Sequence, residues 1–485
     1  MRRAAISLLI LAIVLPAVAD AAPRRRSVRK TTFIPAGSRG KVMSEVVGAN
    51  DPGPVSGSCN ATRRSCDAAK YCFPGTNSAC LEAGFADGQA WRACIYTTEY
   101  GGGTQGPSKG FAIGPVDFRK EAGAPWERVL YTAGTAEIFT GYDNVAANSN
   151  STRLYDTRVS TWRNINGTID HNWSRNPLTP EHVPQATGEL ITLSKDQSFG
   201  PRIAAECRDR GIAWLCHGQD RFGGTPTQTK VRRGEELVLW GVFDAANYDF
   251  VVEYGFRDDG SISFRTGATG YNNPRLCTPE VNGCGGVPHI HDVLWRVDAD
   301  VNGGASDSIL ETAHEDGNPQ RDEERPFNGG VEGGIVWNPN ELTSLLIEDE
   351  SRVNRFGHHP GYGIHPQRFG NARQSIVTPQ SSELVWTQYD FWATRWKPEE
   401  NTAWADRYFF PDRYLTEYTT FPAPEGLQET DVVLWYMATA HHDPIDEDRE
   451  PDGDYGITLA HFFGFEMSPH NVFEANPLGR PTICE

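Results

Sequence analysis

The chain has 485 residues, with 63 Asp and Glu against 45 Lys and Arg, and a formal net charge of −18 at pH 7. This acidity argues against nucleic acid as a partner and favours cationic ligands, although ordinary solubility is the simpler explanation for it. A chain of this length has room for two or three average domains, or for one large β domain with a small companion.

The first residues are typical of a secretory signal peptide. The charged start Met1-Arg2-Arg3 precedes a short apolar run from Ile6 to Val14, and small residues follow around Ala17 to Ala22. The apolar run is too short to act as a membrane anchor, and no later stretch is long enough to cross a bilayer. We therefore expect residues 1–22 to be a signal peptide, and the mature protein to be soluble and secreted or periplasmic, without a membrane contact.

Two short segments follow the expected signal. Residues 23–57 are basic and then rich in Gly, Pro and Ser, which predicts a flexible leader, and residues 58–88 form a Cys-rich N-terminal segment. Ten cysteines in an exported chain indicate disulfides, and a structural zinc site is the alternative for the N-terminal cluster. That cluster consists of Cys59, Cys66, Cys72, Cys80 and Cys94. Further along, Cys207 and Cys216 are nine residues apart, a spacing that suits a local disulfide.

The remaining residues, 89–485, have a uniform β texture. Short runs of Val, Ile, Tyr, Phe and Trp alternate with Gly, Pro, Asn and Asp, and helical periodicity is scarce. This pattern predicts an all-β fold, a large antiparallel sandwich or barrel, and argues against a parallel α/β fold. Within it, residues 250–256 and 261–265 flank Asp258-Asp259-Gly260, which predicts a β-hairpin with a D-G turn.

Two histidines on a predicted strand are the first candidates for metal ligands. His289-Ile290-His291 follows Asn247-Tyr248-Asp249-Phe250 by about forty residues. Side chains two apart on a strand point to the same face, so both histidines can bind one ion, and two imidazoles suit Cu, Zn, Fe or Ni. The alternative is a half-buried strand with two polar histidines. Spacing alone does not choose a third ligand among His441, His442 and the histidines at 358, 359, 365, 461 and 470.

These blocks, in this order, resemble the copper-containing quinone amine oxidases, whose cofactor is topaquinone. Asn247-Tyr248-Asp249-Phe250 is similar to the family's N-Y-[DE]-[YF] cofactor motif, and His289-Ile290-His291 to its H-x-H pair. The stretch from Asp431 to Asp448 resembles the segment with the third copper ligand and points to His442 rather than His441. The resemblance begins at about residue 90, so we expect the family's usual small N-terminal domains to be missing and access to the site to be wider.

The resemblance implies a role for each matching residue. Copper would be bound by His289, His291 and His442, and Tyr248 would become topaquinone and form a Schiff base with the amine. Residues 136–142 resemble the segment whose last residue, here Tyr142, positions the quinone. Asp156 matches the family's proton acceptor, fourteen residues later. Arg158 stands where the family has glycine, and a guanidinium there would lower the pKa of Asp156 or alter substrate access.

The resemblance also implies a calcium site away from the copper. Its ligands would be Asp298, the Ala299 carbonyl, Asp300, Asp431 and the Val432 carbonyl, and such hard oxygen ligands suit calcium. His291 and Asp298 are seven residues apart, and Asp431 and His442 are eleven apart, so on regular strands the histidines and the acids face opposite sides. The alternative is a set of solvated turn aspartates.

The function implied by the resemblance is a secreted, homodimeric primary-amine oxidase that uses copper and topaquinone. It would convert RCH2NH2, with O2 and water, to aldehyde, NH3 and H2O2. One alternative is a catalytically silent copper-binding relative, which Arg158 favours; another is an oxidase of peptidyl lysine, which wider access would admit. A zinc hydrolase with three histidines is a third, but hydrolysis has no need of the tyrosine motif.

Overall fold

The computed structural model describes a large part of the chain after residue 65. The described residues are 66–97, 111–142, 154–159, 177–184, 187–193, 200–217, 229–245, 248–271, 288–303, 306–314, 318, 322–367, 382–401, 403, 414–449 and 456–479. The chain divides into the units Met1–Pro52 and Gly53–Glu485, and all described residues belong to the second. The expected signal peptide and flexible leader therefore lie outside the described residues.

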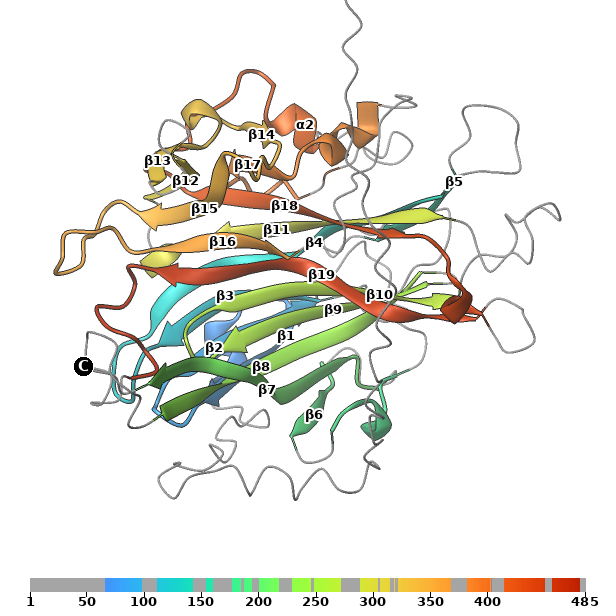
Figure 1. Cartoon of the computed structure of the whole chain (residues 1–485), viewed down its shortest axis with the longest axis horizontal. Coiled ribbons are helices and arrows are strands. Elements are labelled where there is room, and N and C mark those ends of the chain that lie inside the picture. Colours follow the sequence, from blue (N-terminus) through green and yellow to red (C-terminus); the bar gives the residue numbers. More distant parts are fainter. Residues whose placement is uncertain are drawn as a thin grey trace, which may run out of the picture. The chain divides into compact units, whose positions relative to one another are not determined.

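Two antiparallel sheets contain nearly all the regular structure (Figure 1). The nine-stranded sheet has the order β1 (Asn77–Gly84), β2 (Ala90–Thr97), β3 (Ala112–Arg119), β4 (Glu127–Tyr142), β11 (His289–Ala299), β18 (Val432–His442), β17 (Phe391–Arg395) and β14 (Gly333–Ile335), with β5 (Leu154–Val159) paired to β4. Strands far apart in the sequence are thus neighbours, above all β4, β11 and β18.

The ten-stranded sheet has the order β13 (Asp322–Pro326), β12 (Asp307–His314), β15 (Leu342–Asp349), β16 (Gly361–Gln367), β19 (Ile457–His470), β10 (Ile262–Tyr271), β9 (Tyr248–Arg257), β8 (Thr229–Ala245), β7 (Ile203–His217) and β6 (Gly188–Ile191). The described helices are short: α1 (Ala68–Tyr71), α2 (Leu415–Tyr418) and the 3-10 turns η1 (Pro180–His182), η4 (Val301–Gly303), η6 (Phe327–Gly330), η7 (Ser382–Gln388) and η8 (Asp446–Asp448). In the part of the chain that the structure describes, none of them has the length and apolar character needed to cross a membrane.

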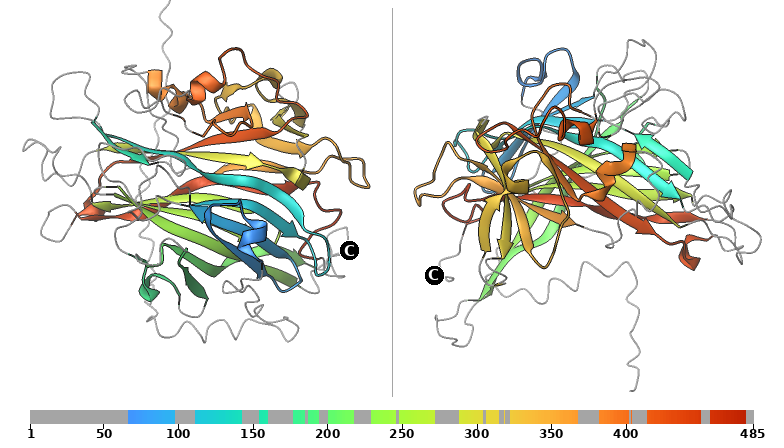
Figure 2. Two further views of the ribbon diagram at one scale, coloured as in Figure 1. Left: turned by 180° about the vertical axis from the view of Figure 1, so that it is seen from behind. Right: turned by 90° about the horizontal axis from the view of Figure 1, so that it is seen from above.

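The two sheets pack face to face around one apolar core (Figures 1 and 2). The ring centroid of the buried Trp295 on β11 lies 5.6 Å from the ring centroid of Tyr254 on β9. It also lies 5.6 Å from the ring centroid of Phe264 on β10. Phe264 in turn stacks on Phe465 of β19 at 4.5 Å. The predicted antiparallel β-sandwich is confirmed.

Local turn chemistry explains the hairpin between β9 and β10. The amide of Arg257 donates to the carbonyl of Ser261 at 2.9 Å, and Gly260 adopts a φ of 86°. Glycine reaches this left-handed region without the steric cost of a Cβ, so Asp258-Asp259-Gly260 turns the chain as its sequence predicts.

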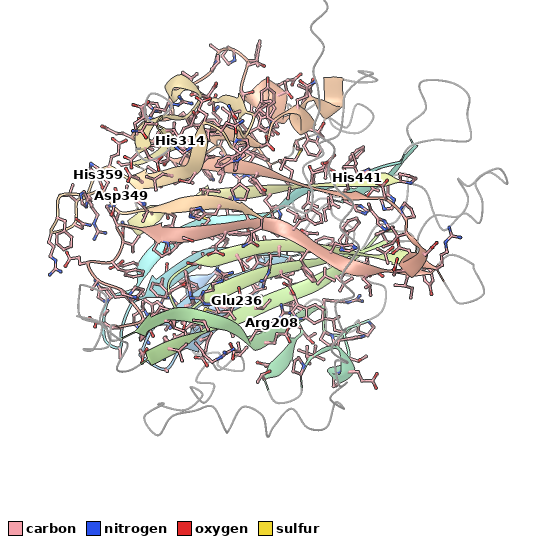
Figure 3. All side chains as sticks on the ribbon, in the orientation of Figure 1. Arg208, Glu236, His314, Asp349, His359 and His441 are labelled. Atoms are coloured by element: carbon pink, nitrogen blue, oxygen red, sulfur yellow. A yellow bond between two sulfur atoms is a disulfide. The ribbon has the colours of Figure 1, made fainter. Side chains whose placement is uncertain are left out.

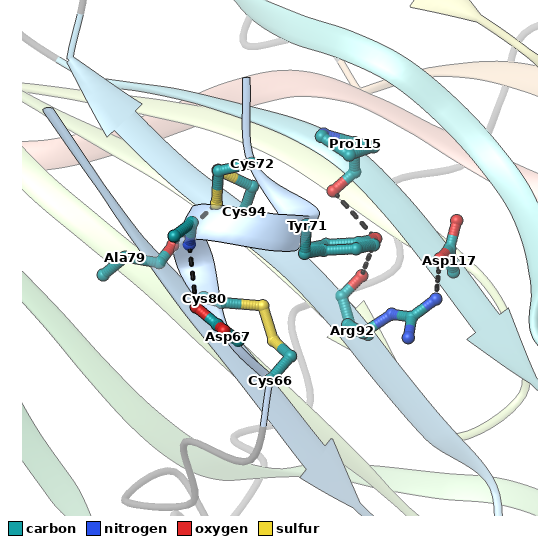
Figure 4. Close-up of a disulfide and its surroundings, with 11 residues drawn as sticks. Cys66, Asp67, Tyr71, Cys72, Ala79, Cys80, Arg92, Cys94, Pro115 and Asp117 are labelled. Carbon is teal, nitrogen blue, oxygen red and sulfur yellow. Dashed lines mark hydrogen bonds and ion pairs between the residues drawn. A yellow bond between two sulfur atoms is a disulfide. The ribbon is translucent and has the colours of Figure 1, made fainter. Parts of the chain in front are cut away.

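The Cys-rich segment is tied to the nine-stranded sheet. Two disulfides, Cys66–Cys80 and Cys72–Cys94, join α1 to the hairpin of β1 and β2, in which Cys80 is paired with Cys94 (Figure 4). These four cysteines therefore form disulfides rather than the alternative zinc site. Cys207 is also disulfide-bonded, whereas Cys59 and the side chain of Cys216 lie outside the described residues.

Candidate active site

The three predicted histidine ligands share one face of the nine-stranded sheet. In the register of β11 and β18, His289 is opposite His442 and Ile290 is opposite His441. Cross-strand partners lie on the same face, so His442 lies with His289 and His291, on the side that carries Trp295 into the core. His441 lies on the other side, and its side chain is 36% exposed. The fold thus brings His442, and not His441, to the histidine pair.

Tyr248 reaches the histidines from the opposite sheet. It is the first residue of β9 and is only 2% exposed. Its hydroxyl lies 3.0 Å from Nε2 of His289, 3.0 Å from Nδ1 of His442 and 3.3 Å from Oγ1 of Thr458. Its ring centroid is 4.8 Å from that of His291. A small cavity beside these groups is lined by Tyr248, Ala268, His291, Ala440, His441, His442, Thr458 and His461.

Polar neighbours orient two of the imidazoles. Oγ1 of Thr140 lies 3.0 Å from Nδ1 of His291, and Oδ2 of Asp448 lies 2.9 Å from Nε2 of His442. If these ring nitrogens carry the protons, Nε2 of His291 and Nδ1 of His442 keep lone pairs for a metal. Nε2 of His291 is buried and has no hydrogen-bond partner among the described groups. A buried, unsatisfied imidazole nitrogen fits a missing metal ligand bond.

Burial disfavours the charged forms of His291, His442 and Tyr248. It lowers the pKa of His291 well below its usual value, and His289, His442 and His461 add to the effect. It also lowers the pKa of His442, against the opposing pull of Asp448. Metals bind neutral imidazole, so these shifts favour a metal site. Burial raises the pKa of Tyr248, which is therefore a neutral phenol as it stands.

The ring nitrogens of the three histidines lie near one another, but not close enough to bind one ion. Nε2 of His289 and Nδ1 of His442 are 3.3 Å apart, with the hydroxyl of Tyr248 in contact with both. The ring centroids of His289 and His291 are 4.7 Å apart. The three histidines do not bring one ligand atom each within 4.8 Å of one another. Among the described residues, one other group of three side chains does. A shared ion thus requires Nε2 of His291 to move towards the other two nitrogens.

The backbone brings the remaining predicted catalytic residues to the same end of the sheet. β4 ends at Tyr142, opposite His289 in the register. β5, which carries Asp156, pairs with β4 beside a register shift between Thr140 and Gly141. The side chains of Tyr142, Asp156 and Arg158 lie outside the described residues, as does Asn247.

The predicted calcium ligands form an acidic cluster away from the histidines. Asp298 is opposite Val433 in the register of β11 and β18 and lies on the face opposite the histidines, with its carboxylate 3.8 Å from Arg296. Burial raises the pKa of Asp298 well above its usual value, with Asp431 and Asp300 adding to the rise and Arg296 opposing it. Burial, reinforced by Asp300, raises the pKa of Asp431 to about 6. The backbone places Ala299 and Val432 beside these acids on the paired strands, and a bound cation would offset the repulsion.

The sequence did not predict the contacts of four residues at these two sites. Thr140 and Thr458 have no local signal, because each meets its partner across strands. Asp448 was visible only as part of the segment around the third histidine. Asp307 is a further buried acid beside the acidic cluster; burial, with repulsion from Asp300 and Asp349, raises its pKa to about 9.

Comparison with known proteins connects this geometry to one group of enzymes. The family model described as copper amine oxidase, enzyme domain, matches residues 208–481. Primary amine oxidase 2 of Arabidopsis thaliana is 28% identical over 273 residues, which are 51% of this chain and 38% of the relative. Copper amine oxidase vicK1 of Bipolaris victoriae is 25% identical over 382 residues, 74% of this chain and 51% of the relative. The chain spans about half the length of these curated relatives, or less.

Solved structures show the same fold. A copper-containing benzylamine oxidase from Hansenula polymorpha aligns with a TM-score of 0.57 and 17% identity, covering 82% of this chain and 60% of the other. An amine oxidase from Aspergillus nidulans aligns with a TM-score of 0.56 and 18% identity, covering 82% and 52%. At these identities the similarity concerns the fold alone.

Proposed function

Because the chain belongs to the copper amine oxidase family, we propose that it is a secreted primary-amine oxidase that depends on copper and topaquinone. It converts RCH2NH2, O2 and H2O to RCHO, NH3 and H2O2. The observation that carries the proposal is the position of the Tyr248 hydroxyl, 3.0 Å from a nitrogen of His289 and 3.0 Å from one of His442. A phenol in contact with two buried imidazoles is placed for oxidation by a metal that they bind.

His289, His291 and His442 are the proposed copper ligands, and Tyr248 is the proposed precursor of the quinone. Copper supplies the chemistry of oxygen, and the quinone supplies an electrophilic carbonyl that no ordinary side chain offers. Asp448 and Thr140 hold His442 and His291 in the tautomers that direct the free nitrogens inward. Thr458 contacts the Tyr248 hydroxyl and limits the orientations of the ring.

Asp156 and Tyr142 complete the proposal on the substrate side. Asp156 takes a proton from the carbon next to the amine nitrogen, as a general base. Tyr142 is the proposed residue that positions the ring of residue 248. We further propose a calcium ion at Asp298, Asp300 and Asp431 with the Ala299 and Val432 carbonyls, and a homodimeric assembly.

Reconstitution of the copper-free chain in air tests this proposal. Copper is added to the full chain, and H2O2 release with benzylamine, phenylhydrazine titration and the mass of the peptide containing Tyr248 are measured. We expect a modified Tyr248 and amine-dependent H2O2. An unmodified Tyr248 in copper-loaded, oxygen-exposed protein contradicts the proposal. A modified Tyr248 without turnover of any primary amine instead supports a catalytically silent relative, the alternative that Arg158 favours.

Asp156→Asn is expected to lower kcat/KM for the accepted amine by about 10²- to 10⁴-fold, because it keeps the shape but removes the basic carboxylate. The phenylhydrazine titre is expected to stay at the wild-type level, since cofactor formation does not use this base. Asp443→Asn is the matched control, because the Asp443 side chain is 67% exposed and faces His441. Wild-type turnover by the Asp156→Asn enzyme would move the base elsewhere.

Asp448→Ala is expected to weaken copper binding by about 10- to 100-fold, as the loss of a group that orients a ligand histidine typically does. The physical reason is the 2.9 Å contact between Asp448 and Nε2 of His442. Competition with a chelator of known affinity measures the change, and Asp443→Ala serves as the control. Equal copper affinities of the two variants would show that Asp448 does not orient the ligand.

A further inference from the structure

One imidazole and two carboxylates meet on the outer face of the ten-stranded sheet. They are Glu324 on β13, Glu348 on β15 and His470 at the end of β19, and their ligand atoms all lie within 4.8 Å of one another. We propose that these three side chains bind one divalent cation of the zinc type, at a site separate from the histidines and from the acidic cluster at Asp298.

The strand register places Glu348 and His470 in one row across the sheet. Glu348 is opposite Gly361 on β16, and Gly361 is opposite His470 on β19. The middle position of this row has no side chain. A Cβ at position 361 would lie only 2.9 Å from Cγ of Glu348 and 2.4 Å from the carbonyl oxygen of Ile347. The glycine therefore leaves the space in which the Glu348 side chain lies and through which it approaches His470.

Glu348 is a buried acid that lies next to a second carboxylate. Its residue is 6% exposed, and its carboxylate lies within 4.8 Å of ligand atoms of Glu324 and His470. Burial first, and then repulsion from Glu324 and Glu350, raise the pKa of Glu348 to about 7, while His359 opposes the rise. Burying a carboxylate beside another one costs free energy, and a cation bound to both glutamates would offset that cost.

The ligand types select the class of metal. Calcium and magnesium take oxygen ligands, whereas an imidazole with two carboxylates suits zinc and its transition-metal neighbours. Burial lowers the pKa of His470 against the opposing pull of Glu324, and His358 and His365 add to the lowering. Three protein ligands leave a tetrahedral ion one position for water or for a further group.

The cluster is remote from the proposed copper site. β19 has Thr458, which contacts Tyr248, near its start and His470 at its end. Twelve residues of extended strand span about 40 Å. Figure 3 shows the same separation, because His359 and Asp349 lie at one end of the molecule drawn and His441 at the other. The ion would instead connect β13, an edge strand with mostly exposed residues, to β15 and β19.

Zinc titration of the copper-loaded full chain tests the proposal, with calcium present at saturation so that the acidic cluster is occupied. Bound copper and zinc are counted by mass spectrometry after gel filtration, and Tm is measured with and without zinc. We expect one zinc per chain beyond the copper, and a Tm that rises with zinc concentration because the ion binds the folded state. No zinc uptake by the copper-loaded chain would overturn the proposal.

Variants locate the bound zinc. Glu348→Gln and His470→Gln are expected to lose the zinc and the zinc-dependent rise in Tm, while the copper content stays unchanged. Glu324 is exposed, so Glu324→Gln tests the site without disturbing buried packing and is expected to weaken zinc binding at least tenfold. Glu350→Gln and His359→Gln are the matched controls on the same hairpin. Zinc uptake that survives all three cluster substitutions would place the ion elsewhere.

Discussion

Tyr248→Phe is expected to abolish amine oxidation completely. Phenylalanine fills the same buried space at the start of β9 but lacks the oxygen that lies 3.0 Å from His289 and 3.0 Å from His442. Without that oxygen the ring has no starting point for conversion to a quinone. Enzymes commonly accelerate their reactions by about 10⁶-fold or more, so losing the cofactor leaves no measurable turnover.

Copper binding separates this effect from unfolding. The three imidazoles remain in Tyr248→Phe, so we expect the variant to bind copper at the wild-type stoichiometry and to give no adduct with phenylhydrazine. Tyr362→Phe is the control, because Tyr362 is an equally buried tyrosine on β16 in the same core. Amine turnover by Tyr248→Phe, or loss of activity in Tyr362→Phe alone, would remove Tyr248 from the chemistry.

His442→Ala is expected to lose copper, the quinone and activity together, whereas the adjacent His441→Ala keeps all three. The sheet decides between these neighbours, because His442 shares the inner face with His289, while His441 is opposite Ile290 on the other face. Removing one of three ligands should weaken copper binding by more than the roughly 100-fold that loss of an orienting group can cause. Copper content after dialysis and the phenylhydrazine titre measure both variants.

The two histidine variants serve as controls for each other, since they differ by one position on one strand. If His441→Ala loses copper and His442→Ala retains it, the third ligand is misassigned and the contact with Asp448 is structural. If both variants retain copper at full stoichiometry, the ion does not bind at the histidines of β11 and β18. Replacing both His289 and His291 then shows whether the strand pair contributes at all.

Local sequence determined the features that need only neighbouring residues. The spacing of His289 and His291 places both on one face, because side chains on a strand alternate. The D-G pair between β9 and β10 specifies its turn, because glycine at position 260 adopts a positive φ without strain. The apolar runs separated by turn residues predicted the β-sandwich, and the antiparallel sheets confirm it.

Strand order and register, which no local pattern contains, decided the rest. Tyr248 meets His289 and His442 only because β9 of one sheet packs over β11 and β18 of the other, and Thr140 meets His291 only because β4 pairs with β11. Glu324, Glu348 and His470 come from three strands separated in the chain, and Gly361 leaves the space in which Glu348 lies. Long-range pairing of this kind depends on how whole sheets bury their apolar faces, so a contact between residues far apart in the sequence is determined only once the tertiary structure has formed.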